Sequence, residues 1–300
     1  MAAPAQVDLD PIAEIYSANV KAKFQSAQKL QGIMPEVSNS GAGVRHDWIG
    51  SSLEMSEVPT GASEIDTSNV SFSPVVTKPL RFVIKTSIAQ SDQSLTNINL
   101  IRAHTQLHGM AAARTVDILK IRAIFENPDI PVGSLTTIPS TIGPNKGLET
   151  DKIIAMSTEL NNEDVPDEDR IIISNSDQYK TLKKDEKYIR DSYTGRHQLV
   201  DGGLKQIEGF ELRKLGKNAS NSLPITPDST NFDSYAVALQ FEAMQFIYNV
   251  PLYTRIVADN ANGNYVIFTE MLANAQIIQK AGIVLAALVL DANGDAPVNS

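Results

Sequence analysis

Two histidines, His104 and His108, stand four residues apart, a spacing that lets two imidazoles bind one metal ion on a helix. In the zinc-protease pattern a glutamate follows the first histidine, whereas Thr105 and Gln106 stand here. No third ligand is evident beside them. We therefore interpret both histidines as packed or surface polar residues and predict no metal site.

A second candidate for cation binding is an acidic run around Pro166. It consists of Glu163, Asp164, Asp167, Glu168 and Asp169. Calcium loops place oxygen ligands at alternate positions around a central glycine, and this run has neither feature. The run therefore predicts a solvated turn, as charge runs usually do.

The remaining residues that could take part in catalysis are isolated in the sequence. His46 stands beside Asp47, but the four histidines are scattered, and no serine lies in a nucleophile-elbow motif. Gly41-Ala42-Gly43 lacks the lysine and hydroxyl residue of a phosphate loop. The chain has no cysteine, which excludes a disulfide, a thiolate metal site and a cysteine nucleophile. We predict no catalytic residue, no metal and no cofactor.

The composition favours a folded protein that does not grip nucleic acid. The 300 residues can form one large domain or two small ones, and the net charge of −9 argues against a phosphate-binding surface as the main function. Residues 1–10 lack the pattern of a secretory signal. The longest apolar run, residues 283–290, is far shorter than the ~20 residues that span a membrane. We expect a soluble protein made in the cytoplasm.

The first 45 residues predict a helix followed by a hinge. Residues 10–31 carry a loose apolar stripe at helical spacing, and Asp10 with Pro11 suits a helix start. The stripe comprises Ile12, Ile15, Val20, Phe24, Ala27 and Leu30. A modest helix at a terminus favours packing on another surface. Gly41 and Gly43, among small polar residues, predict the hinge.

Residues 48–58 and 72–88 predict two extended arms that flank a polar tip. In the second arm, apolar and polar residues alternate. The pattern indicates a long two-stranded ribbon, and an isolated ribbon is marginal in water. We therefore expect its apolar side chains to need a partner surface. They are Trp48, Leu53, Met55, Phe82 and Ile84.

Residues 94–127 predict the longest helix, which ends before Pro128. One face carries Ile98, Ile101, Thr105, His108, Ala112, Val116, Leu119 and Ala123. A helix of this length, at ~1.5 Å per residue, forms a spine that can order the elements laid against it. The Pro- and Gly-rich residues 129–147 predict a linker and a subdomain boundary.

The second half predicts an α/β segment and then strands. We expect a helix near residues 150–160, a buried strand at residues 171–173, a helix from Ser176 through Tyr188, and an extended segment at residues 207–215. Strands follow at residues 235–241, 246–248, 253–257, 265–269 and 283–290. Asn262-Gly263 predicts a hairpin, and residues 268–275 are compatible with a short helix.

This order of elements resembles the major capsid proteins of tailed phages. Their Hong Kong 97-type fold is shared with herpesvirus shells and encapsulins. The most specific similarity is to the family's axial-domain pattern of a proline turn, a buried strand, a helix and a Gly-Phe strand entry. The matching residues are Val165-Pro166, Arg170 to Ser174, Tyr179 to Leu182, Gly203-Leu204 and Ile207 to Leu212.

The resemblance implies an α+β, Hong Kong 97-like fold. Residues 1–45 would form the N-terminal arm, residues 46–90 the extended loop, residues 91–130 and 242–300 the peripheral domain with its spine helix, and residues 131–241 the axial domain. On this reading the apolar ribbon residues contact neighbouring subunits. Gly41 and Gly43 form the hinge that lets the arm and ribbon change direction.

The function that the resemblance implies is self-assembly, not catalysis. Pentamers and hexamers would form an icosahedral shell around double-stranded DNA, bound without sequence specificity, and the virion capsid would assemble in the host cytoplasm. A separate scaffolding protein, a portal and decoration proteins are the implied partners. The alternatives are an encapsulin-like compartment and, from another class, a small-ligand-binding or enzymatic α/β protein.

Overall fold

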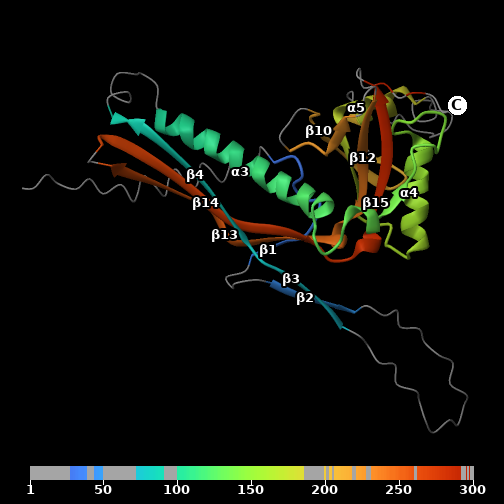
Figure 1. Ribbon diagram of the computed structural model, residues 1–300, viewed down its shortest axis with the longest axis horizontal. Helices are drawn as coiled ribbons and strands as arrows, with labels where there is room; N and C mark the ends of the chain where they lie inside the picture. The colour runs from blue at the N-terminus through green and yellow to red at the C-terminus, as the bar shows by residue number, and fades with distance from the viewer. Residues whose placement is uncertain are drawn as a thin grey trace, which may run out of the picture.

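A computed structural model describes the chain over residues 28–38, 44–49, 72–90, 100–185, 199–200, 203–204, 206–217, 221–227, 231–259 and 262–291, and at residues 295 and 297. Helices and strands are mixed in these residues, as predicted. The largest elements are a four-stranded sheet, a seven-stranded sheet and one long helix that runs along the four-stranded sheet (Figure 1).

The four-stranded sheet has the order β1-β13-β14-β4. Its strands are β1 (Glu36–Ser38), β13 (Met244–Asp259), β14 (Asn264–Ile277) and β4 (Leu80–Ala89). β1 is parallel to β13, and the other pairs are antiparallel. The predicted hairpin at Asn262-Gly263 is confirmed, because β13 and β14 flank it and Gly263 has a φ of +64°.

One prediction in this sheet is wrong, and two predicted strands are joined into one. The short helix at residues 268–275 is absent, because this segment lies in β14, where every second side chain from Ile267 to Ile277 is buried. The strands predicted at residues 246–248 and 253–257 are parts of the single strand β13. Pro251 lies within β13, where the register with β14 is irregular between Tyr248 and Tyr253.

The spine helix is confirmed as α3 (Leu100–Phe125), which packs on one face of this sheet. Its 26 residues extend roughly 39 Å. Six residues of the predicted face are buried: Thr105, His108, Ala112, Val116, Leu119 and Ala123. Ile101 is half-buried, and Ile98 lies outside the described residues.

The seven-stranded sheet has the order β5-β15-β12-β6-β10-β9, with β11 paired to β12. Its strands are β5 (Thr136–Ile138), β15 (Ile283–Asp291), β12 (Asn231–Gln240), β6 (Arg170–Asn175), β10 (Phe210–Leu215), β9 (Gln206–Ile207) and β11 (Ile225–Pro227). The predicted buried strand is confirmed, because all six residues of β6 are buried. A separate small hairpin joins β7 (Leu199–Val200) to β8 (Gly203–Leu204).

Several boundaries differ from the prediction for local reasons. The extended segment at residues 207–215 contains a tight turn, because Glu208 and Gly209 have positive φ and β9 folds back on β10. The linker at residues 129–147 includes a 3₁₀ turn, η1 (Val132–Ser134), and β5, which pairs with β15. Helix α5 (Ser176–Lys184) is capped by Asn175 and not Ser176, and it ends before Tyr188.

Both faces of the seven-stranded sheet are covered. Successive side chains of β6 alternate between two cores, so that Ile171 and Ile173 pack with α3, whereas Ile172 packs with the predicted helix α4 (Thr150–Asn162) and α5. The first core continues into the four-stranded sheet through Phe246 and Met271. One apolar core therefore joins the spine helix to both sheets.

The first described residues are anchored to α3 by buried charges. The backbone N–H groups of Lys29 and Leu30 donate to the Asp117 carboxylate at 3.0 and 3.1 Å. The Lys120 ammonium donates to the Leu30 carbonyl at 2.9 Å and to Glu36 at 2.8 Å. Residues 28–31 are therefore not helical, and the predicted helix at residues 10–31 is wrong over these four residues. Residues 1–27 lie outside the described chain.

The anchor works because each buried charge has its own partners: Asp117 accepts from two backbone N–H groups and the Asn221 amide, and Lys120 pairs with Glu36. Asp117 and Lys120 are both fully buried, where an unpaired charge would be costly. Burial lowers the pKa of Lys120, and the nearby Glu36 and Asp117 carboxylates oppose that shift. Burial and Glu36 also raise the pKa of Tyr248 well above its usual range. The segment from residue 29 to β1 is thus built into the core of the protein.

A second polar network lies between α3 and the sheet. The ring nitrogens of His108 lie 3.0 Å from the Thr86 hydroxyl and 2.9 Å from the Thr269 hydroxyl. Thr269 also contacts the Thr254 hydroxyl at 3.0 Å. The interpretation of His108 as a packed polar residue is confirmed. Burial, with a smaller effect of His104, lowers its pKa.

Replacing Asp117 by alanine is expected to cost about 3–5 kcal/mol of unfolding free energy, because two backbone N–H groups and the Asn221 side-chain amide lose their buried acceptor. Urea denaturation of purified subunits measures this. Arg122→Ala, which removes an exposed ion pair on the same helix, is the control and should cost less than about 1 kcal/mol. Equal losses in the two variants would contradict the role of the anchor.

The His108 network predicts a stability that depends on pH. The folded-state pKa is lowered, so the unfolded chain binds the proton more readily, and stability should fall as pH drops below the usual histidine value of about 6.5. We expect the urea midpoint to decrease between about pH 8 and pH 5. His108→Gln should flatten this dependence, whereas His104→Gln should retain most of it. The same slope in wild type and His108→Gln would disprove the assignment.

Candidate assembly surfaces

A two-stranded ribbon projects from the body of the protein (Figure 1). β2 (Val44–Ile49) pairs antiparallel with β3 (Phe72–Thr77), and neither strand belongs to the two large sheets. Of the two predicted arms, residues 48–49 and 72–77 lie in this ribbon. Val76 is 55% exposed, so the described part of the ribbon presents apolar surface that its own subunit does not cover.

The structure places only some of the predicted ribbon and hinge residues. Trp48 lies in β2, opposite Ser73. Leu53 and Met55 lie outside the described residues, as do Gly41 and Gly43 between β1 and β2. Their roles stay predictions.

The second predicted arm divides into two strands with different surroundings. β3 belongs to the ribbon, whereas β4 follows Lys78-Pro79 and pairs with β14 over its whole length. Phe82 packs against the main core, and Ile84 is half-buried on the same face. The prediction that both lack burial in their own subunit is therefore wrong. In the sequence, residues 72–88 look like one extended segment. The pattern of apolar and polar residues therefore does not reveal that the segment pairs first with β2 and then with β14.

A further apolar surface, which the sequence reasoning missed, lies on the face of the four-stranded sheet opposite α3. We call it the outer face. It carries Val83, Tyr253 and Val257, each 45–48% exposed. Phe268 and Leu272 lie half-buried on the same face. Strand side chains alternate between the two faces of a sheet. The apolar residues at alternate positions to the predicted core residues are therefore the sequence signal that could have identified this face.

Polar residues fix the geometry of the outer face. The Arg255 guanidinium lies 4.7 Å from the centre of the Phe268 ring, and Arg81 pairs with Glu270 at 2.7 Å. In register, Val83, Glu270 and Tyr253 form one row across three strands. The face is therefore an ordered surface of apolar and aromatic groups held in place by charged neighbours, a composition suited to protein contacts.

The acidic run has a structural explanation. Its five acidic residues are exposed, as predicted for a solvated turn. The buried Arg170 organises it, because its guanidinium donates to the Pro166 carbonyl at 2.9 Å and pairs with Asp167 at 3.0 Å. Within the part of the chain that the structure describes, no three His, Asp or Glu side chains gather as a metal site requires, and no helix has the length and apolar character of a membrane span.

The sequence matches the family described as phage capsid protein over residues 10–287. No curated protein sequence matches the chain. The fold is similar to the capsid protein of cyanophage P-SCSP1u, with a TM-score of 0.62 at 13% identity over 85% of this chain and 86% of that one. It is also similar to the capsid protein of a native GTA particle, with a TM-score of 0.64 at 11% identity over 87% and 90% of the chains.

A third similar structure is a virus-like particle from Pyrococcus furiosus, with a TM-score of 0.58 at 11% identity over 92% of this chain and 99% of that chain. These likenesses confirm the predicted α+β, Hong Kong 97-like capsid fold. The family match covers nearly the whole chain. The chain therefore belongs to the phage capsid protein family and is a major capsid shell protein.

Proposed function

We propose that copies of this chain form pentamers and hexamers that close into an icosahedral shell around double-stranded DNA. The observation that carries the proposal is the pair of surfaces left uncovered within one subunit. One is the projecting ribbon of β2 and β3, and the other is the outer face of the four-stranded sheet. Each supplies apolar groups that a neighbouring copy can bury.

The ribbon of one copy lies on the outer face of the next copy. The apolar residues of the ribbon would contact Val83, Tyr253 and Val257 of the neighbour. These ribbon residues are Trp48 and Val76, together with Leu53 and Met55, which lie beyond the described strands. The two surfaces are different, so the contact is heterologous, and heterologous contacts form closed rings when the rotation between copies closes. Such rings are the capsomers of the shell.

Modest contacts are sufficient for this assembly. Burial of apolar surface stabilises by ~25 cal/mol per Å², so a few hundred Å² per contact yields several kcal/mol before entropic costs. Each subunit makes several contacts, and multivalency makes the closed shell stable from weak pairwise affinities. Gly41 and Gly43, which precede the ribbon, act as the hinge that sets its direction.

The domain assignment follows the two sheets. Residues 1–45 form the N-terminal arm, anchored through residues 29–36, and the extended loop within residues 46–90 is the ribbon with its tip. α3 and the four-stranded sheet form the peripheral domain. The seven-stranded sheet with α4 and α5 forms the axial domain. Because β15 belongs to this sheet, we assign it to the axial domain, although it lies in the range of residues 242–300 that was predicted as peripheral.

The role of the chain is structural and not catalytic. The shell encloses DNA without sequence-specific contacts, and a net charge of −9 limits adhesion to the phosphate backbone. A separate scaffolding protein, a portal and decoration proteins are the expected partners of assembly in the host cytoplasm.

A compartment that holds protein cargo is the second candidate. The likeness to the Pyrococcus furiosus virus-like particle, over 99% of that chain, places the same fold in a particle that is not named as a phage capsid. Analysis of purified shells separates the two, because extracted DNA supports the phage capsid and co-purified cargo protein supports the compartment.

Deleting residues 58–69, the predicted tip of the ribbon, should leave the two sheets folded and prevent shell formation. Circular dichroism of the variant reports folding, and sedimentation velocity with negative-stain microscopy reports assembly. Normal particles from this variant would show that the ribbon tip does not join the subunits.

The outer face is tested by the double substitution Val83→Lys and Tyr253→Lys. Both lysines flank Glu270 in the sheet, so the fold should survive. The contact should lose several kcal/mol, at ~1.5–3 kcal/mol per apolar side chain. We expect sedimentation to show free subunits or small oligomers. Leu107→Lys with Met110→Lys, at exposed positions on α3, is the matched control and should still form shells. Equal assembly by both double variants would refute the role of the outer face.

A further inference from the structure

The seven-stranded sheet has two ends of opposite charge. β6 and β10 are parallel neighbours, so the residues before both strands meet at one end of the sheet, and the residues after them meet at the other. Each strand has six residues, which at ~3.3 Å per residue separates the ends by roughly 20 Å. Salt at physiological strength screens exposed charges beyond about 8 Å, so the two ends do not neutralise each other within one subunit.

The acidic end lies where the two strands begin. The acidic run around Pro166 precedes β6, and the turn between β9 and β10 adds two more carboxylates. These turns are neighbours, because a Cβ on Gly209 would lie 3.9 Å from the Asp167 carbonyl oxygen. The acidic end consists of Glu163, Asp164, Asp167, Glu168, Asp169, Glu208 and Glu211.

Most of these carboxylates face solvent without a cation. Asp167 pairs with the buried Arg170, and Glu211 pairs with Arg213, both at 3.0 Å. Within the residues that the structure describes, the other five acidic side chains make no hydrogen bond or ion pair. The end therefore keeps a net negative charge that its own subunit does not compensate.

A small hollow opens at the acidic end. Asp169 and Glu211 contribute to its mainly polar lining, together with Gly32 and Gly209. Its volume of about 210 Å³ is below the usual range for ligand pockets, and it leaves room for a single side chain. The two carboxylates favour a cationic side chain in this hollow.

Lysines gather around one tyrosine at the opposite end of the sheet. α5 follows β6 and lies at this end (Figure 1), and Lys214 stands near the end of β10. The Lys183 and Lys214 ammonium groups lie 5.1 and 5.2 Å from the centre of the Tyr179 ring. Cations that share one ring also repel each other, so an anion placed beside both is stabilised.

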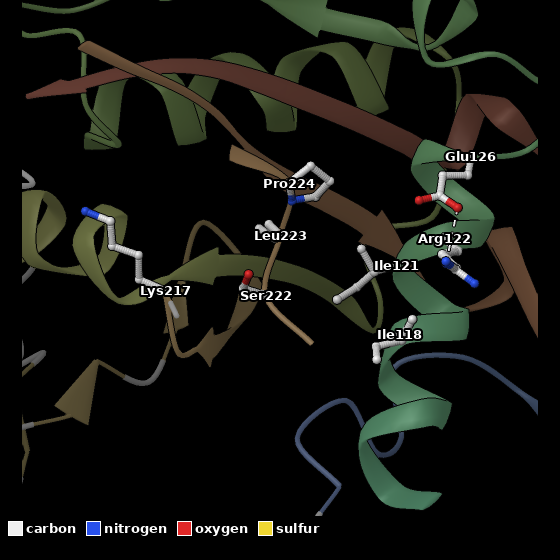
Figure 2. Close-up of a pocket in the computed structure, with 8 residues that line it drawn as sticks. All are labelled: Ile118, Ile121, Arg122, Glu126, Lys217, Ser222, Leu223 and Pro224. Atoms are coloured by element: carbon white, nitrogen blue, oxygen red, sulfur yellow. Dashed lines mark ion pairs between the residues drawn. The ribbon is translucent and has the colours of Figure 1, made fainter. Parts of the chain in front are cut away.

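Further lysines leave this basic end with excess positive charge. Lys180 and Lys184 share a single carboxylate, that of Asp295, at 2.9 and 2.6 Å. Hydrogen bonds from these two lysines lower the pKa of Asp295. Lys217 pairs with Asp177 at 2.6 Å and marks the limit of the basic end, since α3 lies across a pocket from it (Figure 2).

We propose that the acidic end of one subunit binds the basic end of the next subunit in a capsomer. Lys214, which is exposed, enters the neighbour's hollow beside Asp169 and Glu211. The two surfaces lie at opposite ends of one sheet, so the contact is heterologous and can repeat around a ring. This inference rests on the proposed shell and adds the contact that orients the subunits, because charge complementarity fixes register more than affinity.

Charge reversal of each end tests the contact in the full-length protein. One variant carries Glu168→Lys with Glu208→Lys, a second carries Lys183→Glu with Lys214→Glu, and a third combines all four substitutions. Circular dichroism checks that each variant folds, and sedimentation velocity measures the fraction of protein in shells, with the wild type in parallel.

The matched control is Glu126→Lys with Asp129→Lys, which reverses the same charge at exposed positions outside both ends. Figure 2 shows Glu126 on α3, paired with Arg122. We expect this control to form shells at the wild-type level.

Each end-reversed double variant should form about tenfold fewer shells or less, because like charges then face each other across the contact. The fourfold variant should recover most of the loss, since opposite charges meet again. A fourfold variant that assembles no better than either double variant would overturn the pairing of the two ends.

Normal shells from both double variants would also overturn this contact while leaving the proposed shell intact. Loss of shells in the lysine variant alone would mean that the basic end binds another polyanion, such as DNA, and would overturn the acidic end as its partner. Absence of shells from the wild type would overturn the proposed function itself, and this contact with it.

Discussion

A carboxylate and an ammonium, buried one helical turn apart on α3, connect the structure. Asp117 and Lys120 replace the hydrogen bonds that residues 29 and 30 would have made in a helix. They hold the chain in the position from which β1 joins β13. The cost of burying two charges is offset only while both are paired. The segment from residue 29 to β1 is consequently fixed against the core of the protein.

The same helix leaves part of the subunit's apolar surface uncovered. α3 covers one face of the four-stranded sheet, and both faces of the seven-stranded sheet are covered by helices or by the shared core. The outer face keeps Val83, Tyr253 and Val257 exposed, and the ribbon holds Val76 in solvent. A monomeric protein would normally cover such a surface. In the proposed shell a neighbouring copy covers this surface, so the hydrophobic effect would act first in folding and then in assembly.

Segments with a clear hydrophobic pattern or a clear turn signal were predictable from the sequence. The eight-residue face of the spine helix, the run Ile171-Ile172-Ile173 and the Asn262-Gly263 turn each depend on short-range spacing, and the structure agrees wherever it describes them. Predictions failed where the partner lay far away in sequence. Phe82 alternates like a ribbon residue but packs on the core, and residues 268–275 could be a helix until β4 and β13 pair on either side.

The sequence alone determined the kind of protein, because the order of arm, ribbon, spine helix and strands resembled that of a capsid subunit. Only the tertiary structure decided which apolar residues are core and which are surface. Asp117 and Lys120 look like ordinary helix charges, and Val83 and Tyr253 look like ordinary strand residues. Hydrophobicity is a property of each residue, whereas burial depends on which distant segment lies against it.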